Sequence, residues 1–273
     1  MKLTNPSPAY SVPPVVRAFK LLRHIASGDA VANMSVTART LGISRTTLIR
    51  LVATLEAEQM IERAADGRSY KLGLGLAGLA GRALFTSDIV QVGDGIIQQL
   101  TEVLALSSHI GVLTGRDVLY VARRTPNVHL VSNVGLGSRL PAHATTLGRI
   151  ILAHLPRETV TDLFSGVRLA AATAKTPTTL AALMRQLDID FKAGIAWSDS
   201  HFEIGISSAA AAIFDRTGGV AGAINVTGPS ASFSTHTRRR PEIEKAVREA
   251  AAQISQRLGH EPAGAAENKR RAR

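Results

Sequence analysis

Arginine and threonine side chains are concentrated between residues 44 and 50, and their chemistry is that of nucleic-acid contact. The segment contains Ser44, Arg45, Thr46, Thr47 and Arg50, with no acidic residue among them. A guanidinium group can donate two parallel hydrogen bonds to the edge of a guanine, and hydroxyl groups can donate to phosphate oxygens. The segment therefore predicts a surface that lies against double-stranded DNA.

A second group of polar residues is spread over the C-terminal half and would suit a small organic acid. The candidates are Thr145 and Thr146, Asp199 and His201, and Asn225 and Thr227. The two threonines stand where a glycine-rich loop opens a helix, and the free N–H groups of a helix start attract anions. A ligand pocket needs only a few such polar groups in an apolar wall. Structural roles are the alternative, since the strand residues could complete edge hydrogen bonds and Asp199 could cap a turn.

Two short helices joined by a turn are predicted to carry the first group. Residues 35–41 form the first helix, Gly42 ends it, and Ser44 caps a second helix that runs to about Ala57. The second helix has one apolar stripe at i, i+3, i+4 and i+7, made of Leu48, Leu51, Val52 and Leu55. This arrangement describes a helix-turn-helix, and an ordinary helical hairpin with a solvated face is the alternative.

The flanking segments extend this motif to a winged helix. Upstream, Ser11 and two prolines mark a helix start, and Val15, Phe19, Leu22 and Ala26 keep helical spacing until Gly28. Downstream, residues 61–63 and 69–72 read as strands on either side of Asp66-Gly67, a strong hairpin signal. Arg68 beside the hairpin tip is expected to approach a narrow minor groove, where the potential is most negative.

Residues 73–78 spell Gly-x-Gly-x-x-Gly, but their context does not favour a dinucleotide site. The preceding strand belongs to a small hairpin rather than a βαβ unit, and no second strand ending in an acidic residue follows about 20 residues later. We expect residues 74–87 to form a helix that links two domains and offers a contact for dimerisation.

The remainder predicts an α+β domain with an antiparallel sheet. A helix from Ser87 precedes a hairpin around residues 115–117, a strand near Val128–Val134, a glycine-rich loop and a helix over residues 145–154. Residues 180–190 read as another helix, residues 209–215 and 220–226 as strands, and residues 243–258 as the final helix. Strands in runs beside helices favour an α+β architecture.

Composition places constraints on the partners. The net charge is +5 over residues 1–73, +1 over 74–235 and +5 over 236–273, so the two ends are basic and the middle is nearly neutral. A nucleic-acid partner for one end explains this distribution. The absence of cysteine excludes disulfides, iron–sulfur clusters and thiolate zinc sites. We expect a cytoplasmic protein, because residues 1–10 lack the apolar core of a signal peptide and no apolar run is long enough to span a membrane.

Two long motifs resemble the signature of IclR-type bacterial transcriptional regulators. One runs from Gly137 to Arg149 and continues through residues 152–156, and the other runs from Gly194 to Gly205. The resemblance covers residues 12–259. The segment 118–123 and the run 137–142 look most like regulators of aromatic-acid breakdown, such as those for protocatechuate and hydroxybenzoate.

The resemblance implies a ligand-responsive transcription factor that forms dimers or tetramers. Its winged helix-turn-helix would occupy residues 12–73 and bind a roughly palindromic operator, followed by the linker helix and a GAF-like effector domain over residues 88–259. That domain would bind a small carboxylate, with Leu147 joining the effector-binding residues. Residues 1–11 and 260–273 are expected to be a disordered arm and a disordered basic tail.

This chain departs from the family pattern in two places. His201 stands where an acidic residue is usual, and residues 207–212 read Ser-Ser-Ala-Ala-Ala-Ala where an arginine and a proline are common. These differences should make the pocket less acidic and change its shape.

Two other classes of protein remain as alternatives. An enzyme of the α+β domain would need a nucleophile with a base, a metal cluster or a cofactor loop, and the chain has neither a Gly-x-Ser-x-Gly nor a His-Glu-x-x-His motif. We therefore expect no catalytic residue, no metal and no cofactor. A DNA-binding protein without an effector would leave the large neutral domain without a role.

Overall fold

The chain folds into two compact units, residues 1–86 and residues 87–273. The computed structural model describes residues 10–29, 31–85, 88–127, 134–233 and 239–261. Most of the expected N-terminal arm and of the expected basic tail therefore lies outside the described residues. We refer to the two parts as the N-terminal unit and the C-terminal unit, and describe each by itself.

Three helices form the body of the N-terminal unit: α1 (Pro13–Ala26), α2 (Met34–Leu41) and α3 (Arg45–Ala57). The side chain of Asn33 caps α2, and Gly42 ends it with φ +66°, a left-handed conformation that glycine adopts without strain. Ser44 accepts a hydrogen bond from the backbone N–H of Thr47 and so begins α3. Leu48 and Val52 are buried between the helices, as their spacing predicted.

Helix α1 buries a different face from the one that its apolar spacing suggested. Leu21 and Ile25 enter the core, at 0% and 6% exposure. Val15 and Phe19, in contrast, are 51% and 53% exposed. Helix α1 carries two apolar rows, and periodicity alone cannot tell which of them faces the neighbouring helices.

A two-stranded wing completes the N-terminal unit. Strands β1 (Ile61–Arg63) and β2 (Tyr70–Leu72) pair antiparallel, with Ile61 opposite Leu72. Helix α4 (Leu74–Phe85) follows directly. Gly73 and Gly75 pack so closely on the carbonyl of Gln59 that a Cβ at either position would clash with it, at 2.2 and 2.7 Å. The first two glycines of the Gly-x-Gly-x-x-Gly run therefore have a packing role at this turn.

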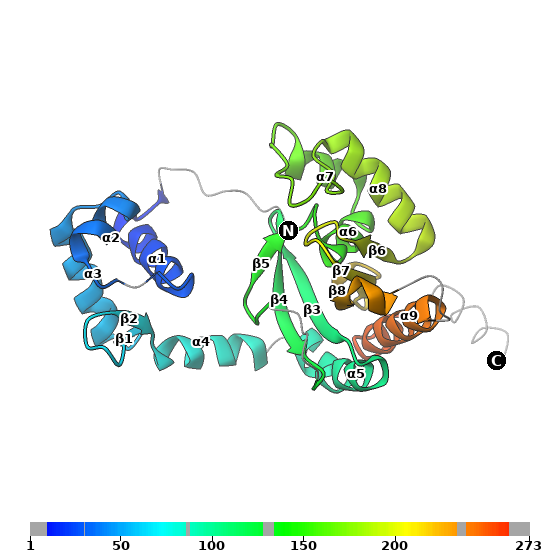
Figure 1. Ribbon diagram of the computed structural model, residues 1–273, viewed down its shortest axis with the longest axis horizontal. Coiled ribbons are helices and arrows are strands. Elements are labelled where there is room, and N and C mark those ends of the chain that lie inside the picture. The colour runs from blue at the N-terminus through cyan, green and yellow to red at the C-terminus, as the bar shows by residue number, and fades with distance from the viewer. Residues whose placement is uncertain (1–9, 30, 86–87, 128–133, 234–238, 262–273) are drawn as a thin grey trace. The chain divides into compact units, whose positions relative to one another are not determined.

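The C-terminal unit is built on one antiparallel sheet of six strands, in the order β5-β4-β3-β8-β7-β6 (Figure 1). The strands are β3 (Ser107–Thr114), β4 (Asp117–Arg124), β5 (Arg139–Pro141), β6 (Ala196–Asp199), β7 (Ile206–Phe214) and β8 (Val220–Pro229). Helices α5 (Asp88–Leu104) and α9 (Arg239–Arg257) pack against one face of the sheet. Helices α6 (Thr146–Ala153) and α8 (Leu180–Ala193), with the short α7 (Arg157–Phe164), lie on the other face. A 3₁₀ turn, η2 (Ser230–Phe233), leads out of β8.

The alanine run of β7 explains how two helical layers approach one strand closely. Ala210 and Ala212 belong to the core cluster under α6. The alternate residues of the strand, Ala209, Ala211 and Ile213, are also buried. Small side chains on both faces of a strand let helices pack near its backbone.

Several predicted elements are confirmed, and three short ones were not anticipated. Helices α5, α6, α8 and α9 and the hairpins β3–β4 and β7–β8 lie where the sequence placed them. The strand expected near Val128–Val134 falls largely outside the described residues. Strand β5 lies instead within the expected glycine-rich loop, and β6 and α7 were missed. These three elements are short, so periodicity is a weak signal for them.

Candidate functional site

The outer face of α3 is polar and open to solvent. Arg45, Thr46 and Arg50 are exposed, and Ala53 on the same face is exposed and small. Ser44 and Thr47 differ from Arg45, Thr46 and Arg50 because their side chains are hydrogen-bonded to each other. Their hydroxyl oxygens lie 2.8 Å apart at the start of the helix. The predicted residues therefore lie at the start and near the middle of α3, and two of them also hold its first turn.

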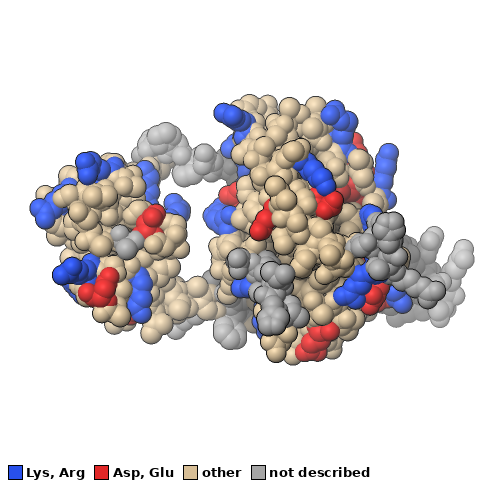
Figure 2. Space-filling view, in the orientation of Figure 1, with Lys and Arg blue, Asp and Glu red and all other residues tan. Residues whose placement is uncertain are grey.

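The arginines predicted to meet DNA form no ion pair with any described carboxylate. Arg45, Arg50 and Arg68 belong to this set, whereas Arg63 pairs with Glu56 at 3.2 Å. Figure 2 shows more basic than acidic side chains on the visible face of the N-terminal unit. Guanidinium groups without internal partners are available to phosphates and bases.

The wing loop is organised by Asp66. Its carboxylate accepts hydrogen bonds from the backbone N–H of Arg68, the backbone N–H of Ser69 and the Ser69 hydroxyl, at 2.9, 2.9 and 2.7 Å. These bonds, those from Ser69 first, lower the pKa of Asp66 to about 2. Gly67 takes the positive φ of the turn, at +64°. The loop thus holds the backbone of Arg68 in place while the Arg68 side chain stays exposed.

A cavity of about 50 Å³ lies in the C-terminal unit, and we call it the ligand cavity. It brings together four of the predicted effector-binding residues, Thr145, Thr146, Asn225 and Thr227. Thr145 caps α6 by accepting a hydrogen bond from the Gly148 N–H at 3.2 Å. The Thr146 hydroxyl lies 2.9 Å from the hydroxyl of Ser208 on β7. The start of α6 therefore faces β7 and β8 across the cavity.

Further residues of the cavity wall were not anticipated from the sequence. They are His109, Tyr120, Val134, Leu140, Ala144, Ser198, Phe202, Glu203, Ile206 and Ser208. His109 is directly opposite Asn225 in the β3–β8 register, and its Nδ1 lies 3.0 Å from Asn225 Oδ1. Burial lowers the pKa of His109 to about 4. No local motif marked His109, because its position depends on a strand pairing across more than one hundred residues.

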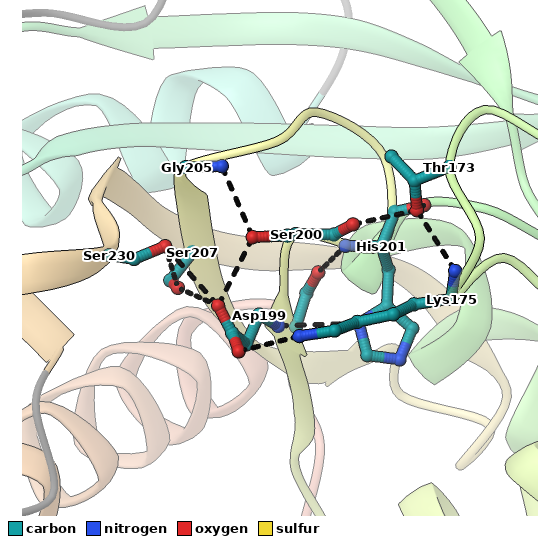
Figure 3. Close-up of polar contacts among 9 residues, drawn as sticks. Thr173, Lys175, Asp199, Ser200, His201, Gly205, Ser207 and Ser230 are labelled. Carbon is teal, nitrogen blue, oxygen red and sulfur yellow. Dashed lines mark hydrogen bonds and ion pairs between the residues drawn. The ribbon is translucent and has the colours of Figure 1, made fainter.

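Three predicted effector-binding residues do not line the ligand cavity. Leu147 is fully buried in the core cluster beneath the sheet. Asp199 ends β6, and its side chain is 66% exposed and pairs with Lys175 at 2.8 Å (Figure 3). This hydrogen bond is the main reason that the pKa of Asp199 is lowered. His201 is half-buried, and its Nδ1 accepts from the Asp199 backbone N–H at 3.3 Å.

Figure 3 shows that Asp199 lies at the centre of a network of polar contacts with the loop that follows β6. Its carboxylate also accepts from the hydroxyls of Ser200, Ser207 and Ser230, at 3.2, 3.4 and 3.3 Å. The sequence indicated a polar loop at this position, but it could not show that the carboxylate is occupied by these partners.

A buried ion pair connects α6 to the neighbouring helix α8. Arg149 Nε donates to Asp190 on α8 at 2.8 Å, and Arg149 also donates to the carbonyl oxygen of Trp197 on β6. The two charged side chains are 0% and 3% exposed. One arginine thus joins α6, α8 and β6, and fixes the helix whose first residues line the ligand cavity.

A broader groove of about 880 Å³ lies between α9 and β7, but its walls are less suited to a small acid. Arg248, an arginine in its wall, already donates to the carbonyls of Ala193 and Gly194 at the end of α8. Among the described residues, no group of three or more His, Asp or Glu side chains could hold a metal ion. No described helix is long and apolar enough to cross a membrane.

Comparison with known proteins agrees with this division of roles. Residues 81–256 match the family model for the bacterial transcriptional regulator IclR C-terminal domain, and residues 14–65 match the IclR helix-turn-helix domain. The regulator KdgR of Escherichia coli K12 is 25% identical over 92% of this chain and 94% of its own length.

Solved structures share the whole fold. The IclR transcriptional regulator from Alicyclobacillus acidocaldarius has a TM-score of 0.80 and 24% identity, covering 92% of this chain and 100% of that one. An IclR homolog from Microbacterium hydrocarbonoxydans, complexed with 4-hydroxybenzoate, has a TM-score of 0.75 and 24% identity over 90% and 98% of the two chains. The relatives are regulators and not enzymes. Because one family model spans more than half of the sequence and a second matches the N-terminal unit, the chain belongs to the IclR family of bacterial transcriptional regulators, with a helix-turn-helix DNA-binding domain and a C-terminal effector domain.

Proposed function

We propose that a small carboxylic acid binds in the ligand cavity and changes how two copies of the recognition helix α3 engage a roughly palindromic operator. The observation that carries this proposal is the cavity itself. It lies within the unit that matches the effector domain, and hydroxyl and amide groups converge on it from α6, β7 and β8.

The start of α6 is the proposed seat of the carboxylate. Thr145 and Thr146 bring hydroxyl groups to this end of the helix, where the helix dipole favours negative charge. Among the described residues, the cavity wall contains no lysine or arginine, and its one acidic residue there, Glu203, is exposed. A single carboxylate held by N–H and O–H donors fits this wall better than a dianion, which would need a cationic partner.

The size of the cavity favours a short acid. An apolar cavity that accepts benzene measures about 150 Å³, whereas the ligand cavity measures about 50 Å³. An acid of about two to four carbon atoms is therefore the primary candidate, on that comparison of volumes. An aromatic acid is the second candidate, because 4-hydroxybenzoate is bound by a homolog of this fold. It would require the loop at residues 200–205 to move outward.

On the DNA side, we propose that Arg45, Thr46 and Arg50 enter the major groove and that Arg68 approaches the minor groove. Ser44 and Thr47 would contribute by fixing the first turn of α3, with their outer edges near phosphates. The exposure of the three arginines and their lack of ion pairs with described carboxylates support these assignments.

A thermal-shift screen tests the effector half of the proposal. Short-chain carboxylates and the benzoate series are added to the full chain, and Thr146→Val serves as a cavity variant that keeps the shape and removes one hydroxyl. We expect a short acid to raise the melting temperature of the wild type, since a ligand that binds only the folded state stabilises it. The shift should be smaller in Thr146→Val. The proposal fails if no acid shifts the wild type, or if the shifts of the two proteins coincide.

A further inference from the structure

His109 lines the ligand cavity and has one ring nitrogen without a hydrogen-bond partner among the described residues. The residue is 0% exposed, and its Nε2 has no hydrogen-bond partner among the described residues. Buried polar atoms in folded proteins almost always have a partner. An orphaned nitrogen on a residue that lines a cavity therefore suggests a partner that arrives from outside the chain.

The contacts of the other ring nitrogen define what Nε2 can do. The Asn225 amide oxygen can only accept, so His109 Nδ1 must carry the hydrogen and donate across the 3.0 Å contact. Burial keeps the pKa of His109 at about 4, and the imidazole is therefore neutral at pH 7. A neutral imidazole with its hydrogen on Nδ1 has a lone pair on Nε2. The free atom is an acceptor and calls for a donor.

Two neighbouring side chains also act on the His109 ring. Tyr120 packs edge-on against the imidazole, with ring centroids 5.4 Å apart. The charged residue that acts on His109 is Arg123, which disfavours protonation. Both His109 and Asn225 line the cavity that the start of α6 also reaches.

We propose that the effector is a hydroxy acid, with its carboxylate at the start of α6 and its hydroxyl donating to His109 Nε2. This inference rests on the proposed function, because it assigns a second group to the same bound acid. A carboxylate cannot donate a hydrogen bond at neutral pH, so a simple acid would leave Nε2 unsatisfied. A short hydroxy acid would satisfy both ends of the cavity.

Matched pairs of acids test the inference on the full-length wild type. Isothermal titration compares glycolate with acetate, and both enantiomers of lactate with propionate. We expect a hydroxy acid to bind about 10- to 100-fold more tightly than its partner, because the partner would leave a buried acceptor unpaired. Equal affinities within the pairs would overturn the inference and would indicate that a buried water satisfies Nε2. The proposal that a carboxylate binds in the cavity would remain intact. Failure of every acid to bind would overturn both.

Two variants identify the residue responsible. His109→Leu removes the acceptor and should reduce the preference for hydroxy acids to less than about threefold. His143→Leu is the matched control, because His143 is equally buried, bonds to the Ala170 carbonyl at 3.0 Å and lies outside the cavity wall. The control should keep the preference. A preference that survives in His109→Leu would contradict the assignment.

A spectroscopic measurement on the wild type does not depend on how the variants fold. The ¹⁵N shift of His109 Nε2 reports whether an unprotonated imidazole nitrogen accepts a hydrogen bond. Saturation with the tighter hydroxy acid should move this resonance to lower frequency, and its deoxy partner should leave it in place. Equal movement with both acids would contradict a contact from the hydroxyl.

Discussion

Arg50 is the residue on which direct readout of the operator should depend most. It lies near the middle of the exposed face of α3, opposite the buried Leu48 and Val52, and pairs with no described carboxylate. If it reads a guanine, Arg50→Ala should weaken operator binding by about 1–3 kcal/mol. Fluorescence anisotropy on an operator selected from random DNA measures the change. Arg185→Ala removes one exposed arginine from the C-terminal unit and serves as the control. Equal affinity of the two variants would refute the role of Arg50.

The residue scale also shows what the sequence could and could not predict at the site. Thr145 and Thr146 were predicted because a helix start can be recognised locally. His109 was missed because its partner Asn225 reaches it only through sheet register. Asp199 was predicted to bind the effector, and the structure shows that its carboxylate is engaged by Lys175 and three serines. Residue type indicates which chemistry is available, and only tertiary contacts show whether that chemistry is already used.

At the scale of elements, the wing is sensitive to acid through Asp66. The folded pKa of about 2 lies below the ordinary value of 3.8, so the carboxylate stabilises the wing above pH 3.8 and loses this effect as the pH falls through about 2. Asp66→Asn should therefore cost more stability at pH 5 than at pH 2. Hydrogen exchange of the Ser69 amide, measured in both proteins at both pH values, reports the difference. A cost that does not change with pH would show that the charge is unimportant.

The junction of α6, α8 and β6 should depend on its buried ion pair. Asp190→Ala leaves the Arg149 guanidinium buried without its carboxylate and should destabilise the C-terminal unit by about 3–5 kcal/mol. Asp188→Ala on the same helix breaks an exposed pair with Arg157 and should cost about 0–1 kcal/mol. The fluorescence of Trp197, the single tryptophan, follows urea unfolding of this unit. Similar costs in the two variants would contradict the structural role of Arg149.

Elements with a strong local sequence signal were predicted correctly. The short strands and the buried face of α1 were not, because their signals are not local. Caps and turn residues identified α2, α3 and the wing, and helical periodicity identified α5 and α9. Strands β5 and β6 have three and four residues, too few for a repeating pattern. In α1, burial of Leu21 rather than Phe19 was decided by the neighbouring helices, which the local sequence does not encode.

In the molecule as a whole, we propose that the N-terminal unit contacts DNA and that the C-terminal unit binds the acid. The uneven charge of the sequence anticipated this division, with a basic N-terminal part and a nearly neutral middle. Coupling between the two sites must be reciprocal, because it is a single free energy. If the acid changes operator affinity by some factor, operator DNA must change acid affinity by the same factor.

The most direct test of the central claim is the operator affinity of the full-length protein, measured by anisotropy with and without the acid that raises its melting temperature. We predict that the acid changes operator affinity by about 5- to 150-fold. Operator DNA should change the affinity for the acid by the same factor. Thr146→Val should reduce the change without altering operator affinity in the absence of acid. An acid that binds and stabilises the protein while operator affinity stays the same would contradict the proposed coupling between acid binding and operator binding.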